Sequence, residues 1–148
     1  MSEIRIRPYH PDDLESMTDL MNDLGYPTTV DRMKHRMEQM EAAPHCHTFV
    51  ATIDEKVVGM IGIRQVHFYE NDGCATQISA LVTKKQYEGQ GIGTALVRYA
   101  EEWALQHKSN VLFLTSGMKP ERIRAHQFYK DRGFEITGYR FVKRLKPQ

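Results

Sequence analysis

The chain is poor in cysteine, has no long apolar run and carries almost no net charge. Its two cysteines, Cys46 and Cys74, lack C-x-x-C spacing, which excludes a disulfide framework and favours a reducing, cytoplasmic setting. No stretch approaches the ~20 apolar residues of a membrane span, and the first residues lack the apolar core of a signal peptide. Twenty lysines and arginines balance 19 acidic residues, so no net field is available to hold nucleic acid or an anionic membrane.

The 148 residues suit one domain, and we expect a single domain over residues 1–148. Hydrophobic periodicity predicts an α/β protein. The expected order is a strand at 4–7, helices at 14–24 and 30–40, strands at 48–53, 57–66 and 75–83, a helix at 91–107, a strand at 111–115, a helix from 120 to 133, and closing strands between 135 and 145. The three middle strands read as an antiparallel meander.

Capping residues support the helix boundaries. Gly25 can adopt the left-handed conformation that ends the first helix, and Thr28 and Thr29 are candidate caps for the second. Gly133 followed by Phe134 predicts a Schellman-type end for the last helix.

A glycine-rich loop joins the strand at 75–83 to the helix at 91–107, and it reads Glu88-Gly89-Gln90-Gly91-Ile92-Gly93. Backbone N–H groups at a helix N-terminus, beside glycines that permit close approach, can bind a phosphate or pyrophosphate. A Walker loop needs a lysine after its last glycine, and a dinucleotide fingerprint needs G-x-G-x-x-G; the loop has neither. The alternative is a tight turn whose glycines serve packing alone.

This loop and a second motif resemble those of the GNAT superfamily of acyl-CoA-dependent N-acetyltransferases. The family's pyrophosphate loop, Arg/Gln-x-x-Gly-x-Gly/Ala, is similar to residues 88–93, and its A-x-x-F-Y-x-x-x-G-F motif is similar to residues 125–134. The resemblance implies a GNAT-like single domain, with a mixed, mostly antiparallel twisted sheet flanked by helices. Its order is β-α-α-β-β-β-α-β-α-β-β, which agrees with the elements expected from Ile4 to Leu145.

The same resemblance implies acetyl-CoA as the acyl donor and no metal. The residues that it assigns to coenzyme binding are Leu81, Val82, Thr83, Glu88, Gly89, Gln90, Gly91, Ile92, Gly93, Thr94, Ala95, Arg122, Ala125 and Tyr129. Glu88 replaces the family's Arg or Gln, and we expect its side chain to point outward. Because such a loop binds through backbone N–H groups, the change should weaken coenzyme binding without abolishing it. Arg122 stands where the family often has asparagine.

By resemblance, Tyr129 is the catalytic residue that donates a proton to the departing thiolate; the alternative is a core aromatic residue beside Phe128. No general base is assigned, because residues 77–80 contain no carboxylate where family members often have a glutamate. The remaining candidates are Glu70, Asp72, His67 and a chain of ordered waters.

Other features have two interpretations each. His45-Cys46-His47 suggests metal ligands, but the two histidines would share a strand face from which Cys46 points away, and no second ligand pair follows. A set of methionines fits either core filling or an adaptable acceptor pocket: Met17, Met21, Met33, Met37 and Met40. The cationic tail fits a solvated strand face, or a site for an anionic acceptor or nucleic acid: Arg140, Lys143, Arg144 and Lys146.

We therefore expect an N-acetyltransferase that moves the acetyl group of acetyl-CoA to a primary amine of a small molecule or peptide, by direct attack in a ternary complex. Neither cysteine lies in either motif, so no covalent acyl-enzyme is expected. The alternative is an acyl-CoA-binding sensor or partner module without turnover. The acceptor, the use of longer acyl groups and the oligomeric state, including a homodimer, stay open.

Overall fold

A computed structural model describes residues 3–146. The chain divides into two compact units, Met1–Leu112 and Phe113–Gln148, and each is described by itself. The elements are β1 (Arg5–Pro8), the 3-10 helix η1 (Pro11–Asp13), α1 (Leu14–Leu24), α2 (Val30–Ala42), β2 (Cys46–Ile53), β3 (Lys56–His67), β4 (Cys74–Thr83), η2 (Lys85–Tyr87), α3 (Ile92–Gln106), β5 (Ser109–Phe113), η3 (Pro120–Arg122) and α4 (Ile123–Asp131). The four helices and first five strands predicted from the sequence are confirmed, with ends that differ by a few residues.

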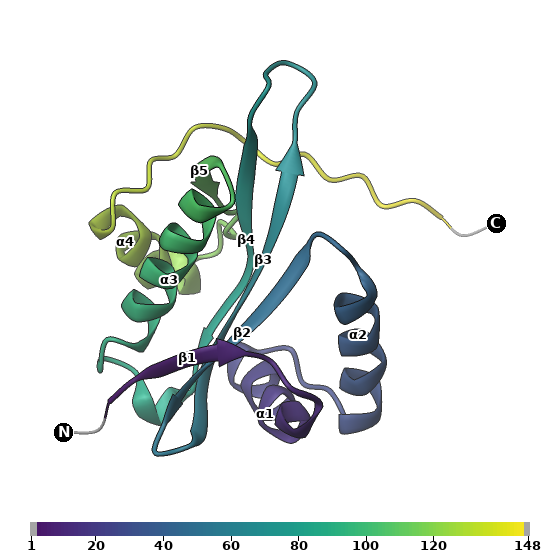
Figure 1. Cartoon of the computed structure of the whole chain (residues 1–148), viewed down its shortest axis with the longest axis vertical. Helices are drawn as coiled ribbons and strands as arrows, with labels where there is room; N and C mark the ends of the chain where they lie inside the picture. The colour runs from purple at the N-terminus through teal and green to yellow at the C-terminus, as the bar shows by residue number, and fades with distance from the viewer. Residues whose placement is uncertain (1–2, 147–148) are drawn as a thin grey trace. The chain divides into compact units, whose positions relative to one another are not determined.

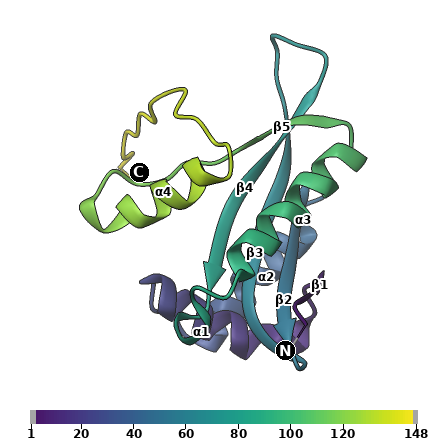
Figure 2. The same cartoon turned by 90° about the vertical axis from the view of Figure 1, so that its left-hand side faces the viewer.

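The strands form one sheet in the order β1-β2-β3-β4-β5. The pairs β1–β2, β2–β3 and β3–β4 are antiparallel, as the meander predicted. Helix α3 connects β4 to its neighbour β5. Figures 1 and 2 show α1 and α2 on one side of the strands and α3 on the other. The sheet is therefore covered on both faces, which suits its long apolar strands.

The methionines of α1 and α2 fill the core between these helices and the sheet. Met17, Met33 and Met37 are 0%, 5% and 4% exposed, and they belong to one cluster with Leu20, Val50, Met60 and Val82. Met21 packs against this cluster, whereas Met40 is 48% exposed. Thioether side chains suit such irregular spaces. The three buried methionines therefore serve core filling rather than an open acceptor pocket.

Helix α3 packs close to the sheet at Gly59 of β3. A Cβ at this position would lie 2.9 Å from Cγ2 of Ile92 and 2.9 Å from the carbonyl oxygen of Val82. Ile92 and Leu96, at the start of α3, are 1% and 0% exposed. A side chain at Gly59 would push against both the helix and the neighbouring strand. The missing side chain thus lets the N-terminal end of α3 pack directly on β3.

The closing strands predicted between residues 135 and 145 are wrong: residues 134–146 contain no helix or strand. Apolar residues do alternate there, but their side chains are exposed, with Tyr139 at 83% and Phe141 at 93%. Alternation sets which face of a strand would be apolar, and a strand also needs a neighbouring backbone for its N–H and C=O groups. The order of elements therefore ends at α4.

A partly buried ion pair fixes the chain between β1 and α1. Asp13 is 7% exposed, and its two carboxylate oxygens accept hydrogen bonds of 2.8 Å each from the Arg7 guanidinium. The backbone N–H of His10 donates to the same carboxylate at 2.9 Å, within a capping box at the start of η1. These hydrogen bonds, above all that from Arg7, lower the pKa of Asp13.

We predict that Asp13→Asn lowers the free energy of unfolding by about 1–2 kcal/mol at pH 7, because it removes the charge that pairs with Arg7, while the amide oxygen can still accept the hydrogen bond from the His10 N–H. Because the pKa of Asp13 is lowered in the folded state, its ionised carboxylate contributes its full stabilisation above the ordinary aspartate pKa of about 3.9. This stabilisation is lost as the pH falls through the pKa of the folded state. Urea unfolding should therefore show a difference in the free energy of unfolding between the wild type and Asp13→Asn that becomes smaller in acid. Asp12→Asn is the control, since the Asp12 side chain is 91% exposed. An equal deficit at pH 7 and in acid would contradict the assignment.

Candidate functional site

The glycine loop begins where β4 leaves the sheet. Val82 and Thr83 pair with Met60 and Gly59 of β3, and the N–H of the next residue, Lys84, donates to the Val58 carbonyl at 2.8 Å. The turn η2 and the loop then lead directly into α3. The end of β4 and the start of α3 are therefore both held by β3, and the loop between them has fixed anchors.

Two glycines give the loop its conformation. Gly89 and Gly91 have φ of +81° and +85°, a left-handed region that side chains disfavour. Gly91 is the N-cap of α3 and provides no side-chain cap, and the first helical hydrogen bond runs from the Ala95 N–H to the Gly91 carbonyl at 3.0 Å. The i→i−4 hydrogen bonds of an α-helix do not use the N–H groups of its first residues, so those of Ile92 and Gly93 are candidates for binding an anion. Glu88 is exposed.

β5 covers only part of the edge of β4 that leads to the loop. The Cys74 thiol lies 3.7 Å from the carbonyl oxygens of both His107 and Lys108, which places the start of β5 level with the start of β4. β5 has 5 residues and β4 has 10, so β5 cannot reach the last residues of β4, Leu81–Thr83. Their backbone groups on the side away from β3 are not covered by β5 and can pair with an extended ligand.

A β-bulge lies just before this open edge. Gly62 pairs with Ala80 and Ile63 pairs with Ile78, so Ser79 has no opposite residue in β3. Such an extra residue interrupts the ladder and leaves backbone groups unpaired, a feature enriched next to active sites. The strand pattern gave no signal for this bulge, because Gln77-Ile78-Ser79-Ala80 reads as a regular strand.

An aspartate on α1 holds the turn that precedes the loop. Asp23 Oδ2 accepts a hydrogen bond of 3.1 Å from the backbone N–H of Lys85, 62 residues further along the chain. Lys85 is the first residue of η2, whose N-cap Lys84 makes no side-chain capping hydrogen bond. Asp23 thus caps the turn from another element. Sequence reasoning missed it, since no local pattern links residues so far apart.

Tyr129 is placed by the end of α4, in the second unit. The Phe134 N–H donates to the Tyr129 carbonyl at 3.1 Å, the Gly133 N–H donates to the Lys130 carbonyl at 3.0 Å, and Gly133 has φ of +91°. This is the predicted Schellman motif. The Phe134 ring contacts the Tyr129 ring edge-on, with centroids 5.6 Å apart. The motif residues Tyr129, Gly133 and Phe134 are thus one local structure.

Burial governs the ionisation of Tyr129. Desolvation raises the pKa of its phenol, and the charge of Arg122 partly opposes that shift. A raised pKa keeps the hydroxyl protonated at neutral pH, so Tyr129 can serve as a proton donor. Arg122 is the N-cap of α4 and shares the second unit with Tyr129. Its position explains an electrostatic influence on the phenol.

The carboxylate and histidine candidates for a general base lie at the wrong end of the sheet. Glu70 and Asp72 are in the hairpin between β3 and β4, at the top of Figure 1, and His67 ends β3. The loop follows the opposite end of β4, and 10 residues of strand separate the two ends by roughly 30 Å. None of the three can take a proton directly from an amine beside the loop.

Within residues 3–146, no three His, Cys, Asp or Glu side chains come together as a set of metal ligands. In the same residues, every helix is too short or too polar to cross a membrane.

The fold and the two motifs are those of the GNAT class of acetyltransferases, and comparison with known proteins agrees. Residues 14–134 match the model of the acetyltransferase (GNAT) family. The chain belongs to this family.

Two relatives are named N-acetyltransferases. An aminoalkylphosphonate N-acetyltransferase of Salmonella typhimurium is 32% identical over 102 residues, which are 69% of this chain and 65% of that protein. An uncharacterized N-acetyltransferase of Bacillus subtilis, YhdJ, is 39% identical over 67 residues, 45% of this chain and 46% of that protein. The matched part of this chain thus spans less than two thirds of these relatives.

Solved structures confirm the fold class. A GNAT family acetyltransferase of Staphylococcus aureus has a TM-score of 0.83 at 25% identity and covers 98% of this chain and 100% of its own. The aminoglycoside N-acetyltransferase AAC(6')-Iy, solved in complex with CoA, has a TM-score of 0.84 at 18% identity and covers 99% of this chain and 97% of its own. At that identity the second likeness shows the fold alone.

We predict that Asp23→Ala speeds hydrogen exchange of the Lys85 amide by about ten-fold, because the loss of a charge-assisted hydrogen bond is worth about 1.5 kcal/mol. Amide exchange measured by NMR at fixed pH checks this. Asp19→Ala is the matched control, since Asp19 is an exposed aspartate of the same helix. Unchanged exchange at Lys85 would show that the contact does not hold the turn.

Proposed function

We propose that the protein transfers the acetyl group of acetyl-CoA to a primary amine. The observation that carries this proposal is the glycine loop: Gly91 caps α3 with backbone alone, beside an edge of β4 that β5 does not cover. Backbone N–H groups at the start of α3 bind the pyrophosphate, and the open edge at Leu81–Thr83 pairs with the amide groups of the pantetheine arm. Both units, Met1–Leu112 and Phe113–Gln148, belong to the proposed domain.

The backbone nature of the loop makes Glu88 tolerable. Its carboxylate is exposed, so water screens its repulsion of a pyrophosphate, and such screened surface charges contribute only tenths of a kcal/mol.

Acetyl transfer also needs hydrogen-bond donors for the negative charge that develops on the thioester oxygen. The bulge at Ser79 interrupts the β3–β4 ladder next to Leu81–Thr83, and its backbone N–H is the donor that this proposal assigns.

Proton transfer limits the chemistry more at the amine than at the thiol. An alkyl ammonium with a pKa of about 10.4 costs roughly 4–5 kcal/mol to deprotonate at pH 7, whereas a thiolate with a pKa of about 8.5 gains only about 2 kcal/mol from a proton. Tyr129, whose partly buried phenol has a raised pKa and keeps its proton, donates the proton to the departing thiolate, which is the smaller of these two contributions. The amine loses its proton to water, because the carboxylates of the β3–β4 hairpin lie too far away.

The acceptor class is the least constrained part of the proposal. One relative is named for aminoalkylphosphonates, so small primary amines with an anionic group are the first acceptors to test. Release of free thiol from acetyl-CoA, measured with a panel of aminoalkylphosphonates, polyamines, amino acids and peptide N-termini, tests both activity and acceptor. Binding of acetyl-CoA without thiol release from any amine would favour the alternative, a coenzyme-binding sensor.

We predict that Gly91→Val raises the dissociation constant of acetyl-CoA at least about ten-fold, because a side chain blocks the approach of the pyrophosphate to the backbone. No atom lies within 4 Å of an added Cβ at Gly91, so the folded protein has room for it. The left-handed φ costs about 1–2 kcal/mol of stability, which thermal unfolding measures separately from calorimetric titration. Gly73→Val, in the β3–β4 hairpin, is the control. Unchanged affinity at Gly91→Val would refute the loop assignment.

Tyr129→Phe keeps the aromatic packing with Phe134 and removes only the hydroxyl. We predict that kcat falls by about ten-fold or more, while acetyl-CoA affinity stays unchanged. General acid–base groups contribute up to ~10²–10⁴-fold to the rate. The fall is small for an acid because a thiolate can also leave unprotonated. Tyr139→Phe is the control, as Tyr139 is 83% exposed. Normal binding with wild-type turnover would show that Tyr129 is a packing residue.

A further inference from the structure

The side chains of β3 alternate between the two faces of the sheet. Gly59 and Gln65 face α3: a Cβ at Gly59 would meet side chains of that helix, and the Gln65 side-chain amide donates to the carbonyl of His107, just after the helix, at 3.3 Å. Met60 faces the other way, since it belongs to the core cluster with the methionines of α1 and α2. Successive strand residues point to opposite faces, so Arg64 lies on the same face as Met60.

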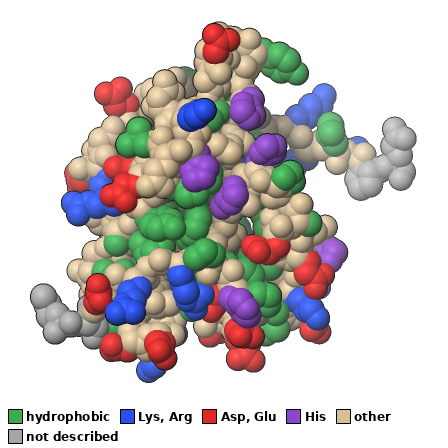
Figure 3. Space-filling view, viewed as in Figure 1, with side chains coloured by type: hydrophobic (Ala, Val, Ile, Leu, Met, Phe, Trp, Pro, Cys, Tyr) green, Lys and Arg blue, Asp and Glu red, His purple; other side chains and the backbone are tan. Residues whose placement is uncertain are grey.

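The face toward α3 is filled around the β-bulge at Ser79. Ile63 and Ile78, the pair next to the bulge, are 1% and 4% exposed. The ring of His47, opposite Ile63 in β2, contacts Trp103 of α3 with centroids 4.9 Å apart. Figure 3 shows further histidine side chains grouped in the upper half of the view. An amine therefore cannot reach the bulge through this face.

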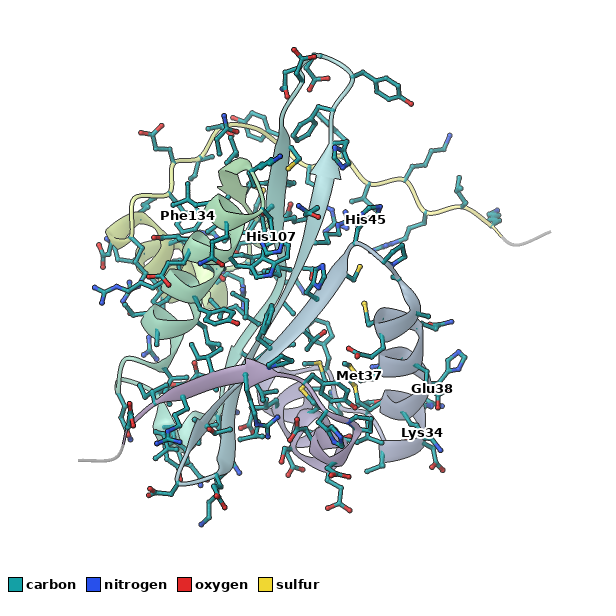
Figure 4. All side chains as sticks on the ribbon, viewed as in Figure 1. Lys34, Met37, Glu38, His45, His107 and Phe134 are labelled. Carbon is teal, nitrogen blue, oxygen red and sulfur yellow. The ribbon has the colours of Figure 1, made fainter. Side chains whose placement is uncertain are left out.

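The opposite face is accessible at the same level. Ser79 and Arg64 are exposed, and a Cβ at Gly62 would lie 3.0 Å from the Ser79 Oγ, which places the Ser79 side chain on the face of Gly62 and Arg64. Gly62 has no side chain, so β3 places nothing between Arg64 and Ser79. Helices α1 and α2 lie beside the lower part of the strands in Figure 1, and Figure 4 shows Met37 on the side of α2 that faces the strands. An amine can therefore approach the bulge from this face, beside Arg64.

Arg64 is oriented before any ligand arrives. Its Nε donates a hydrogen bond to Oε1 of Gln77, the residue opposite it in β4. Among the described side chains, Arg64 makes no ion pair, not even with Glu41 at the end of α2, and neither Nη group has a hydrogen-bond partner. Two free Nη groups match the oxygens of a phosphonate or carboxylate as a fork, and their prior orientation lowers the entropic cost of binding.

The distance from Arg64 to the reaction centre suits a small acceptor. Gln77 and Ser79 are two residues apart on β4, roughly 7 Å, and the Ser79 N–H is the donor that the proposed function assigns to the thioester oxygen. The amine must lie beside that thioester, and an anionic group of the same molecule must lie beside the guanidinium. A short alkyl chain between the two groups spans this distance.

We propose that Arg64 binds the anionic group of the acceptor and thereby selects primary amines that carry a phosphonate or carboxylate a short alkyl chain away from the nitrogen. This inference rests on the acetyl transfer proposed above and adds the residue that determines its acceptor. The pairing also favours the chemistry, because an anion near an ammonium group helps it to keep its proton. Neutralising that anion with Arg64 lowers the pKa of the amine, and loss of this proton is the larger of the two proton-transfer costs.

Thiol release from acetyl-CoA tests the assignment with three acceptors of similar length: aminoethylphosphonate, β-alanine and propylamine. We expect the wild type to have a higher kcat/KM for the two anionic amines than for propylamine, and comparison of the first two identifies the preferred anion. Arg64→Gln should lower the ratio of kcat/KM for the preferred anionic amine to that for propylamine about ten-fold or more, chiefly through KM, because a charge-assisted fork is lost. Arg98→Gln is the matched control, since Arg98 is an exposed arginine of α3.

A failure of this inference differs from a failure of the proposed function. If all three amines release thiol at equal kcat/KM, or if the preference for anionic amines persists in Arg64→Gln, the assignment of Arg64 is overturned and acetyl transfer stands. If none of them releases thiol, acetyl transfer fails for these acceptors, and calorimetric titration of the anionic amines into the protein with CoA tests Arg64 by itself. Saturable binding that Arg64→Gln weakens about ten-fold would support the site, and equal or absent binding would overturn it.

Discussion

The packing of α3 on β3 is the constraint on which the candidate coenzyme site depends. An anion site made of backbone N–H groups has no side chains that adjust to the ligand, so the position of the helix end decides its geometry. Gly59 lets Ile92 approach the strand, and β3 also pairs with the last residues of β4. One strand therefore fixes both ends of the loop, while Asp23 holds the turn between them.

Most of the fold could be predicted because its signals are local. Helix caps at Gly25, Thr29 and Gly133 depend on backbone conformations that only a few residue types favour, and the structure has all three. The closing strands could not be judged in this way, since alternation over residues 135–145 describes a possible strand face and not its partner. The elements of the fold could therefore be predicted wherever a local sequence pattern determines them, but not where a strand depends on pairing with a distant neighbour.

In the candidate site, too, the local features could be predicted from the sequence and the long-range contacts could not. The glycine loop and the cap that holds Tyr129 are continuous segments, and their motifs were visible in the sequence. The contact of Asp23 with Lys85 joins residues 62 apart, and the bulge at Ser79 arises from the register of two strands. Long-range contacts and register depend on packing, which no window of sequence contains. The candidates for a general base, Glu70, Asp72 and His67, were wrong for the same reason. They lie at the start of β4, whereas the glycine loop follows its other end.

The proposed function assigns coenzyme binding and proton donation to different parts of the chain. The loop and the open edge of β4 belong to the unit Met1–Leu112, whereas Tyr129 and Arg122 belong to Phe113–Gln148. Because the proposed coenzyme site consists of backbone groups of the first unit, binding would not require the phenol of the second. Under this proposal, a change confined to Tyr129 would leave a protein that binds acetyl-CoA and turns over more slowly. Turnover, not affinity, therefore distinguishes the proposed enzyme from the alternative, a coenzyme-binding sensor.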